Sequence, residues 1–329
     1  MNKFQIFALK SLRKAYMSFI VSGIQNKPEC VQDADLVSNI IYKTLIDDKP
    51  CMIARFGANE LNALINYQSV TNKSISILKY VKGGQFDWWW NNGIIKNLHQ
   101  VAGFYPPTIN KIEQFCELMI QDIPEVDVLG SWLVGENIFK DQLVKSQKVH
   151  FRLLEPFWSK FPWTSALADK KVLVVHPFAE TILSQYKNRD MLFSNPNVLP
   201  KFISFVVIKA VQSLGEGDDR FNDWFDALDF MKSEIDKQDF DVCLIGCGAY
   251  GFHLAAHVKR SGKKAVHLGG ALQLLFGIKG NRWEDANYGV KEWGIPVGSY
   301  SNLMNEYWVR PGDIYKPKNA EEVEGACYW

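Results

Sequence analysis

The sequence predicts an α/β fold in which a mostly parallel sheet carries helices on both faces. Short apolar segments alternate with segments of helical periodicity along most of the chain. The clearest apolar segments, 170–178 and 241–246, contain few polar residues, as expected for strands buried on both faces of a parallel sheet. A glycine-rich turn follows the second segment and leads into a helix, which indicates a Rossmann-like unit.

The expected elements follow one another in a regular order. Residues 31–48 have helical spacing, and a buried strand is expected over 51–56. A turn at 57–59 then leads into a helix over 60–67, with Asn59 as its N-cap. Residues 202–208 fit either a strand or a helix. The remaining expectations are an aromatic-rich insertion within 86–140, helices over 109–119, 181–187 and 221–237, strands over 126–132, 148–156 and 265–270, and a loop over 188–200.

The composition excludes several classes of protein. With 22% charged and 47% hydrophobic residues, the chain of 329 residues has the profile of a soluble globular protein. Its 37 Lys and Arg nearly balance its 36 Asp and Glu, so no net charge attracts nucleic acid. No apolar run reaches the roughly 20 residues that span a bilayer. Six cysteines without a CxxC pair, and no evident signal peptide, predict reduced thiols in the cytoplasm.

Residues 1–30 form a basic segment ahead of a single domain over 31–329. No acidic residue precedes Glu29, and a helix there would be amphipathic. Its apolar side would comprise Phe4, Phe7, Leu9, Leu12, Tyr16, Phe19 and Ile20. Such a helix either lies on an anionic membrane surface, on the inner face of the membrane, or packs on its own domain or a second subunit of a homo-oligomer.

The glycine-rich turn is the first candidate binding site. Gly246, Gly248 and Gly251 have the G-x-G-x-x-G spacing, and N–H groups of such a turn, which includes Ala249 and Tyr250, bind phosphate at a helix N-terminus. The following strand brings His267 and Gly269 to the same edge. It ends without an Asp or Glu for a ribose, which argues against NAD or FAD. Alternatively, the glycines serve only close helix–strand packing.

The second candidate site follows the strand at 51–56. Arg55 lies in an apolar segment and needs a partner, either Glu60 or a ligand phosphate, because an unpaired buried charge is costly. Gly57 and Asn59 form the turn between them. His176 lies near the C-terminal end of the strand expected within 170–178, at the edge where open α/β sheets bind ligands. Arg282, in the irregular region after 271, is suited to a diphosphate.

These segments together resemble the GT-D class of glycosyltransferases. The resemblance rests on I-x-R-F-G-x-x-E-L at 53–61, paired with the late strand, glycine turn, helix and strand. A closer likeness, over most of 50–329, is to uncharacterised bacterial proteins encoded among polysaccharide genes. It is carried by HPF, IKAVQS, DWF, IGCGAYGFHLAAHVKR, HLGGA, LFGIKG-x-RW, NEYWVRP and CYW.

The resemblance implies transfer of a sugar from a nucleoside-diphosphate donor, with a UDP-sugar favoured, to a glycan or lipid-linked acceptor in surface polysaccharide synthesis. Arg55 would stabilise the leaving diphosphate, and Glu60 or His176 would be the base. The chain departs from the motif at Ala58, where the class has a metal-binding Asp. Either Glu60 holds Mg²⁺ or Mn²⁺ together with phosphate and water, or with the side-chain carbonyl oxygen of Asn59, or Arg55, Arg282 and the glycine turn balance the charge instead.

Two other functions stay open at this point. One is an NAD(P)-dependent sugar-nucleotide oxidoreductase or epimerase that uses the glycine-rich turn. The other is a non-catalytic scaffold of a polysaccharide assembly complex, which the loss of the acidic residue at Ala58 would suit. The nucleotide that binds, if any, discriminates between these functions.

Overall fold

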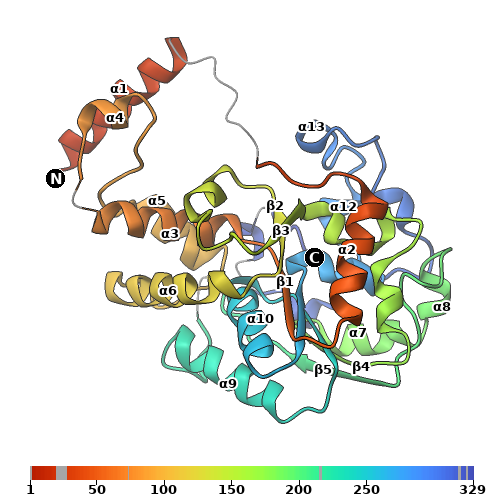
Figure 1. Ribbon diagram of the computed structural model, residues 1–329. Helices are drawn as coiled ribbons and strands as arrows, with labels where there is room; N and C mark the ends of the chain where they lie inside the picture. Colours follow the sequence, from red (N-terminus) through yellow and green to blue (C-terminus); the bar gives the residue numbers. More distant parts are fainter. Residues whose placement is uncertain (1, 20–27, 73, 215–216, 318–319, 324) are drawn as a thin grey trace.

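A seven-stranded sheet forms the centre of the molecule, and all of its paired strands are parallel (Figure 1). The computed structural model describes residues 2–19, 28–72, 74–214, 217–317, 320–323 and 325–329. The strand order is β3-β2-β1-β7-β6-β4-β5. The strands are β1 Cys51–Ala54, β2 Val128–Ser131, β3 Gln147–His150, β4 Lys171–His176, β5 Ser204–Lys209, β6 Val242–Ile245 and β7 Lys264–His267. The α/β prediction is therefore confirmed.

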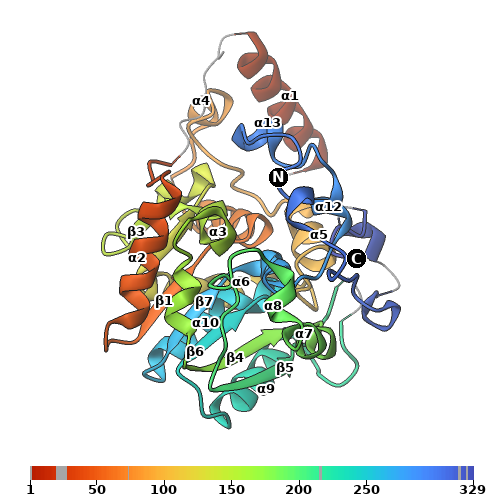
Figure 2. The same cartoon turned by 90° about the vertical axis from the view of Figure 1, so that its right-hand side faces the viewer.

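Helices cover both faces of this sheet (Figures 1 and 2). The α-helices of the described chain are α1 Lys3–Phe19, α2 Ala34–Ile46, α3 Ala58–Thr71, α4 Ile77–Val81, α5 Asn92–Gln100, α6 Ile109–Asp122, α7 Ala179–Tyr186, α8 Arg189–Leu192, α9 Trp224–Asp236, α10 Gly251–Arg260, α11 Leu272–Leu275, α12 Asn281–Glu284 and α13 Val290–Trp293. The 3₁₀ helices are η1 Ile123–Glu125, η2 Val134–Phe139, η3 Phe151–Leu154, η4 Pro156–Trp158, η5 Trp163–Leu167, η6 Gly248–Tyr250, η7 Gly269–Ala271, η8 Ser301–Leu303, η9 Asp313–Tyr315 and η10 Ala320–Glu322.

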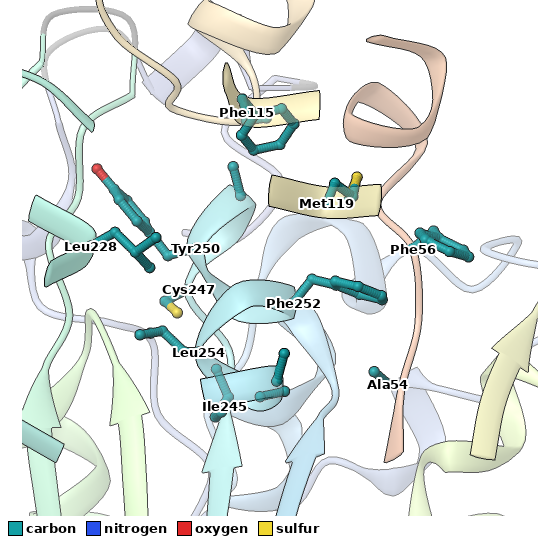
Figure 3. Close-up of a cluster of buried hydrophobic side chains, with 14 of the residues drawn as sticks. Ala54, Phe56, Phe115, Met119, Leu228, Ile245, Cys247, Tyr250, Phe252 and Leu254 are labelled. Atoms are coloured by element: carbon teal, nitrogen blue, oxygen red, sulfur yellow. The ribbon is translucent and has the colours of Figure 1, made fainter. Parts of the chain in front are cut away.

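Two hydrophobic cores lie on the two faces, because successive side chains of a strand point to opposite sides. In β1, Met52 and Ala54 face the core that α3, α6, α9 and α10 cover. Cys51 and Ile53 face the other core, which α2, α7 and the C-terminal region cover. Figure 3 shows part of the first core, where the rings of Phe56 and Phe252 stack with centroids 5.0 Å apart. This contact joins the segment after β1 to helix α10.

A buried polar cluster ties α10 to α6. Asp122, at the end of α6, is 1% exposed, and its Oδ2 lies 2.7 Å from Nδ1 of His253. The Arg260 guanidinium donates to Oδ1 of the same carboxylate at 2.5 Å. A buried carboxylate is stable only with such partners. The cluster therefore sets the position of α10 and of the glycine turn that precedes it.

Several expected boundaries differ from those of the structure. The N-cap of α3 is Gly57 rather than Asn59, because the helix already begins at Ala58. The predicted loop at 188–200 contains the short helix α8. The strand expected over 148–156 ends at His150, and 3₁₀ turns follow it. The ambiguous segment 202–208 forms the edge strand β5, since pairing with β4 decides its structure.

The N-terminal helix α1 packs against α4, and the two helices project from the body of the molecule (Figures 1 and 2). Packing of this helix on its own chain, one of the alternatives that the sequence left open, is thus observed. Leu9 and Tyr16 are half-buried, whereas Phe4, Phe7 and Leu12 are exposed. Ile20, expected on the apolar side, lies outside the described residues. None of the described helices is both long and apolar enough to cross a bilayer.

Candidate functional site

A cavity of about 200 Å³ lies where the carboxyl ends of β1, β4, β6 and β7 meet. We call it the main cavity. The structure brings most of the predicted site residues together in its wall, namely Arg55, Gly57, Asn59, Glu60, His176, Gly246, Gly248, Tyr250, His267, Gly269 and Arg282. Ala249 and Gly251 are not among the lining residues. The turns after β1 and β6 therefore face a single space, because β7 lies between β1 and β6 in the sheet.

Arg55 follows β1 and lies against Gly269 of the segment after β7. A Cβ on Gly269 would be 2.3 Å from Nη2 of Arg55, and the φ of +63° also favours glycine there. Among the described residues, the guanidinium of Arg55 has neither an ion pair nor a hydrogen bond, so the internal pair with Glu60 is not formed. Its charge is available to an anion in the main cavity.

Glu60 directs its carboxylate back over the start of α3. It occupies the third position after the N-cap Gly57, and a Cβ on Gly57 would lie 2.1 Å from its Oε2. The side chain is 9% exposed and reaches the main cavity. Burial raises the pKa of Glu60, although its own backbone N–H and the nearby Arg55 partly offset that effect. A carboxylate with a raised pKa in a cavity is suited to proton transfer near neutral pH.

The glycine turn offers fewer free N–H groups than its spacing predicts. The N–H of Gly246 donates to the Val175 carbonyl, and that of Ala249 donates to the Ala102 carbonyl at 3.2 Å. The N–H of Gly251 donates to the Gly248 carbonyl. Gly248 has a φ of +57° and lines the main cavity, and its N–H has no partner among the described residues. Gly248 is therefore the glycine of the motif best placed to bind a phosphate oxygen.

Gly251 and Tyr250 have packing roles in the structure. A Cβ on Gly251 would lie 2.3 Å from Nε2 of His267, so this glycine lets α10 approach β7. Tyr250 stacks on Trp224 with ring centroids 5.0 Å apart. Its hydroxyl is 2.8 Å from that of Ser213. Gly251 therefore serves close packing of α10 against β7, as the alternative interpretation of the motif predicted. Gly248, in contrast, lines the main cavity.

Both histidines of the main cavity are buried and neutral near pH 7. Burial lowers the pKa of His176 to about 3, and burial together with the charge of Arg55 lowers that of His267 to about 3. The N–H of Phe178 donates to Nδ1 of His176 at 3.0 Å. The proton of the neutral ring must then lie on Nε2. His176 is thereby arranged to donate a hydrogen bond, which suits it poorly to act as the base.

A second, smaller cavity of about 90 Å³ adjoins the main one, and we call it the aromatic cavity. The two cavities share the residues Arg55, Trp132, Gly270, Arg282 and Tyr328. The other aromatic lining residues are Phe151, Trp283, Tyr288 and Trp293. Aromatic faces of this kind stack on the apolar faces of sugar rings. Two arginines, Arg55 and Arg282, therefore line both the main cavity and the aromatic cavity.

Glu155 is the carboxylate of the aromatic cavity, and it is 7% exposed. Its Oε2 accepts hydrogen bonds from Nε1 of Trp158 at 2.7 Å and from the hydroxyl of Tyr300 at 2.8 Å. Oε1 accepts no hydrogen bond within the described part of the chain. Burial raises the pKa of Glu155 to about 7, despite these bonds and the charges of Arg152 and Arg55. This side chain retains a free oxygen for a ligand.

Sequence reasoning missed Glu155 and Trp132. Trp132 directly follows β2, so the rule that ligands bind at the carboxyl ends of parallel strands was the signal that could have found it. Its Nε1 donates to the Phe56 carbonyl at 3.2 Å, which places it beside Arg55. Glu155 lies between two 3₁₀ helices and carries no motif. Tyr328, within the C-terminal CYW, also reaches both cavities.

The side chains of the main cavity do not build a metal site by themselves. Glu60 is the one carboxylate side chain among its lining residues, and Ala58 occupies the position where an Asp was expected. Within the described ranges, no three His, Cys, Asp or Glu side chains come together to hold an ion. The other ligands of a Mg²⁺ or Mn²⁺ ion at Glu60 would have to come from a diphosphate and water.

No family model and no curated protein matches this sequence. The fold is similar to two solved structures of the domain of unknown function 1792, and one of them is described as having a distinct glycosyltransferase fold. That one gives a TM-score of 0.38 and 12% identity over 93% of this chain and 99% of its own. The other, a selenomethionine-substituted structure, gives 0.36 and 12% over 92% and 100%.

Proposed function

We propose that this protein is a glycosyltransferase that uses a nucleoside-diphosphate sugar, with a UDP-sugar as the favoured donor. The observation that carries the proposal is the position of Arg55 and Arg282 on the wall shared by the main and aromatic cavities. The parts of a nucleoside-diphosphate sugar match this arrangement, because its two anionic phosphates lie between a nucleoside and a sugar ring. Arginine is the side chain best suited to bind the diphosphate oxygens.

The leaving diphosphate would be stabilised by Arg55, Arg282 and the N–H of Gly248. The guanidinium of Arg55 forms no ion pair among the described residues, and Gly248 lies in the 3₁₀ turn that leads into α10, where the helix dipole favours negative charge. The Nε2–H of His176 supplies a further neutral donor. These groups are preorganised for charge that develops when the bond from the sugar to the diphosphate breaks.

The sugar ring would occupy the aromatic cavity. Stacking on its aromatic walls buries the apolar face of the ring, and Oε1 of Glu155 accepts a hydrogen bond from a sugar hydroxyl. A site built to accept such a bond discriminates strongly against ligands without the hydroxyl, since the buried oxygen would then lack its partner. Glu155 is therefore proposed to select the sugar.

Glu60 is the proposed base. The acceptor hydroxyl oxygen forms a bond to the anomeric carbon, its proton passes to the Glu60 carboxylate, and the nucleoside diphosphate departs with the electrons of the broken bond. The raised pKa of Glu60 matches this role. Neutral His176, with Nδ1 already bonded to the Phe178 N–H, is assigned to hydrogen-bond donation instead. The acceptor is proposed to be a glycan or a lipid-linked saccharide.

The first test is a thermal-shift screen of the full chain against UDP, GDP, CMP and dTDP compounds and NAD(P), each with and without Mn²⁺. At about 100 times its dissociation constant, a ligand stabilises the fold by about 2.7 kcal/mol. We expect a shift with UDP compounds. A shift with NAD(P) alone would favour an oxidoreductase or epimerase. No shift with any compound, together with firm binding to another transferase, would favour a scaffold.

Two variants examine the residue assignments. Arg55→Lys should weaken UDP binding about tenfold or more, because the two-pronged contact with phosphate oxygens is lost, while Arg189→Lys, outside both cavities, serves as the matched control. Glu155→Gln should leave UDP binding intact and reduce the additional affinity of UDP-glucose, UDP-galactose or UDP-N-acetylglucosamine over UDP. Equal binding of UDP and all three sugars to the unaltered protein would refute the sugar subsite.

Catalysis by Glu60 is examined with Glu60→Gln. Loss of a general base reduces turnover by roughly 10²–10⁴-fold. UDP binding should persist, which separates loss of chemistry from loss of fold. Full UDP release from a UDP-sugar by this variant would eliminate Glu60 as the base.

A further inference from the structure

The pair formed by α1 and α4 carries an unusual concentration of positive charge. Residues 1–28 and 61–86 contain eight Lys and Arg and no Asp or Glu, although the whole chain has a net charge of only +1. We call residues 2–19 and 74–86, which hold six of these eight cations, the α1–α4 arm. The rest of the chain is therefore net negative. A bilayer with anionic lipids would attract the arm and repel the remainder, which orients the molecule.

Contacts within the arm leave most of these charges in solvent. Arg13 packs over the Tyr80 ring at 4.7 Å and donates to the Gln85 carbonyl, and Lys10 lies 3.7 Å from Asp87. Lys3, Lys14, Lys79 and Lys82 are exposed, and none has an ion pair among the described residues. Four cations thus remain free to bind lipid phosphates. Their position on a projecting pair of helices gives them access to a flat surface (Figures 1 and 2).

Large apolar side chains are exposed on the same two helices and their connection. In α1, Phe4, Phe7 and Leu12 are 79%, 70% and 56% exposed, and at α4 the exposed apolar residues are Ile75, Ile77 and Leu78. Each of these side chains is more than half exposed. Lysines together with exposed Phe, Leu and Ile favour a lipid surface over nucleic acid, which would not bury the apolar groups.

We propose that the α1–α4 arm docks this protein on the surface of a bilayer containing anionic lipids, with the cations on the phosphates and the apolar side chains between the headgroups. The arm lies on the surface rather than across the bilayer, since neither helix is long and apolar enough to span it. This inference does not depend on the proposed glycosyltransferase activity.

The test is co-sedimentation of the full chain with vesicles. Vesicles of phosphatidylcholine with phosphatidylglycerol should sediment the protein, phosphatidylcholine alone should not, and added salt should release it. Lys3→Glu combined with Lys14→Glu should weaken binding at least about tenfold, since each basic residue near an anionic surface contributes about 1 kcal/mol. Phe7→Ser should also weaken it. Circular dichroism and the melting temperature without ligand should stay unchanged, which shows that the variants fold.

Matched controls place the same changes elsewhere on the surface. Lys140→Glu with Lys145→Glu alters two exposed lysines that have no ion pair among the described residues, and Phe161→Ser alters a 78% exposed ring outside the arm. These controls should sediment like the unaltered protein. Equal binding to both vesicle types, or equal losses in arm and control variants, would overturn the proposal. A shift from dimer to monomer in the arm variants, measured by light scattering without lipid, would assign the arm to a second copy instead.

Discussion

The carboxylate of Glu60 occupies the space that a side chain at Gly57 would need. A Cβ on Gly57 would lie 2.1 Å from Oε2 and 2.4 Å from Cδ of Glu60. The backbone of Gly57, with φ −76° and ψ 143°, is accessible to any residue. The absence of a side chain at this position leaves room for the Glu60 carboxylate. The backbone conformation itself does not need glycine.

Gly57→Ala should therefore act on Glu60 and leave the fold intact. The Glu60 side chain is flexible and can swing away, so we expect little loss of thermal stability and a fall of at least about tenfold in turnover of a UDP-sugar. Melting temperature and UDP release measure the two effects. Gly312→Ala, at a position with only ordinary contacts, is the control. Unchanged turnover in Gly57→Ala would mean that the position of the Glu60 carboxylate is unimportant.

Gly269→Ala should displace the Arg55 guanidinium. Its Cβ would lie 2.3 Å from Nη2, and the φ of +63° adds backbone strain of roughly 1 kcal/mol. Gly262→Ala isolates that strain, because Gly262 has a φ of +82° and nothing within 4 Å of its Cβ. Both variants should lose similar stability in chemical denaturation, but only Gly269→Ala should weaken UDP binding. Equal UDP affinity of the two would show that Arg55 does not bind the diphosphate.

The stability of the protein should depend on pH through Glu155. Its folded pKa of about 7 exceeds the usual value of 4.5, so the folded state holds a proton that the unfolded state releases. The resulting stability is fully present below about pH 4.5 and is lost as pH rises through about 7. For a buried group this amounts to about 3 kcal/mol. The difference in unfolding free energy between Glu155→Gln and the unaltered protein should grow from pH 5 to pH 7.5; a constant difference would contradict the shift.

Glu155→Gln must be compared with the unaltered protein because the stability contributed by His176 and His267 changes with pH in the opposite direction. Their pKa values of about 3 in the fold lie below the usual 6.5, so they stabilise the protein above pH 6.5 and lose that contribution as pH falls. They contribute equally to both proteins of the comparison and cancel. Denaturant titrations at several pH values supply the measurement.

Asp122→Ala should destabilise the fold without touching either cavity. The change leaves His253 without the partner of its Nδ1 and Arg260 without one of its acceptors. We expect a loss of about 2 to 3 kcal/mol in urea unfolding, below the range for fully buried ion pairs because Arg260 stays partly exposed. UDP affinity at a temperature where the variant is folded should be close to normal. A loss below 0.5 kcal/mol would show that the cluster is energetically unimportant.

The sequence by itself determined the α/β class and the segments that build the site. Apolar runs such as 170–178 and 241–246 predicted buried strands, because periodicity and burial are local properties of the pattern. The rule that parallel strands bind ligands at their carboxyl ends singled out His176, and the cost of an unpaired charge in an apolar segment singled out Arg55 with Glu60 as its possible partner. The structure places all three in the main cavity.

Tertiary structure alone decided how these groups are used. The order β1-β7-β6 puts Arg55 against Gly269, and the contact with Ala102 determines which N–H of the glycine turn is free. Glu155 enters the aromatic cavity from a segment where a strand was expected and 3₁₀ helices form instead. Such contacts join residues distant in the chain, and no local pattern encodes hydrogen-bond partners or burial that depend on the packing of other elements.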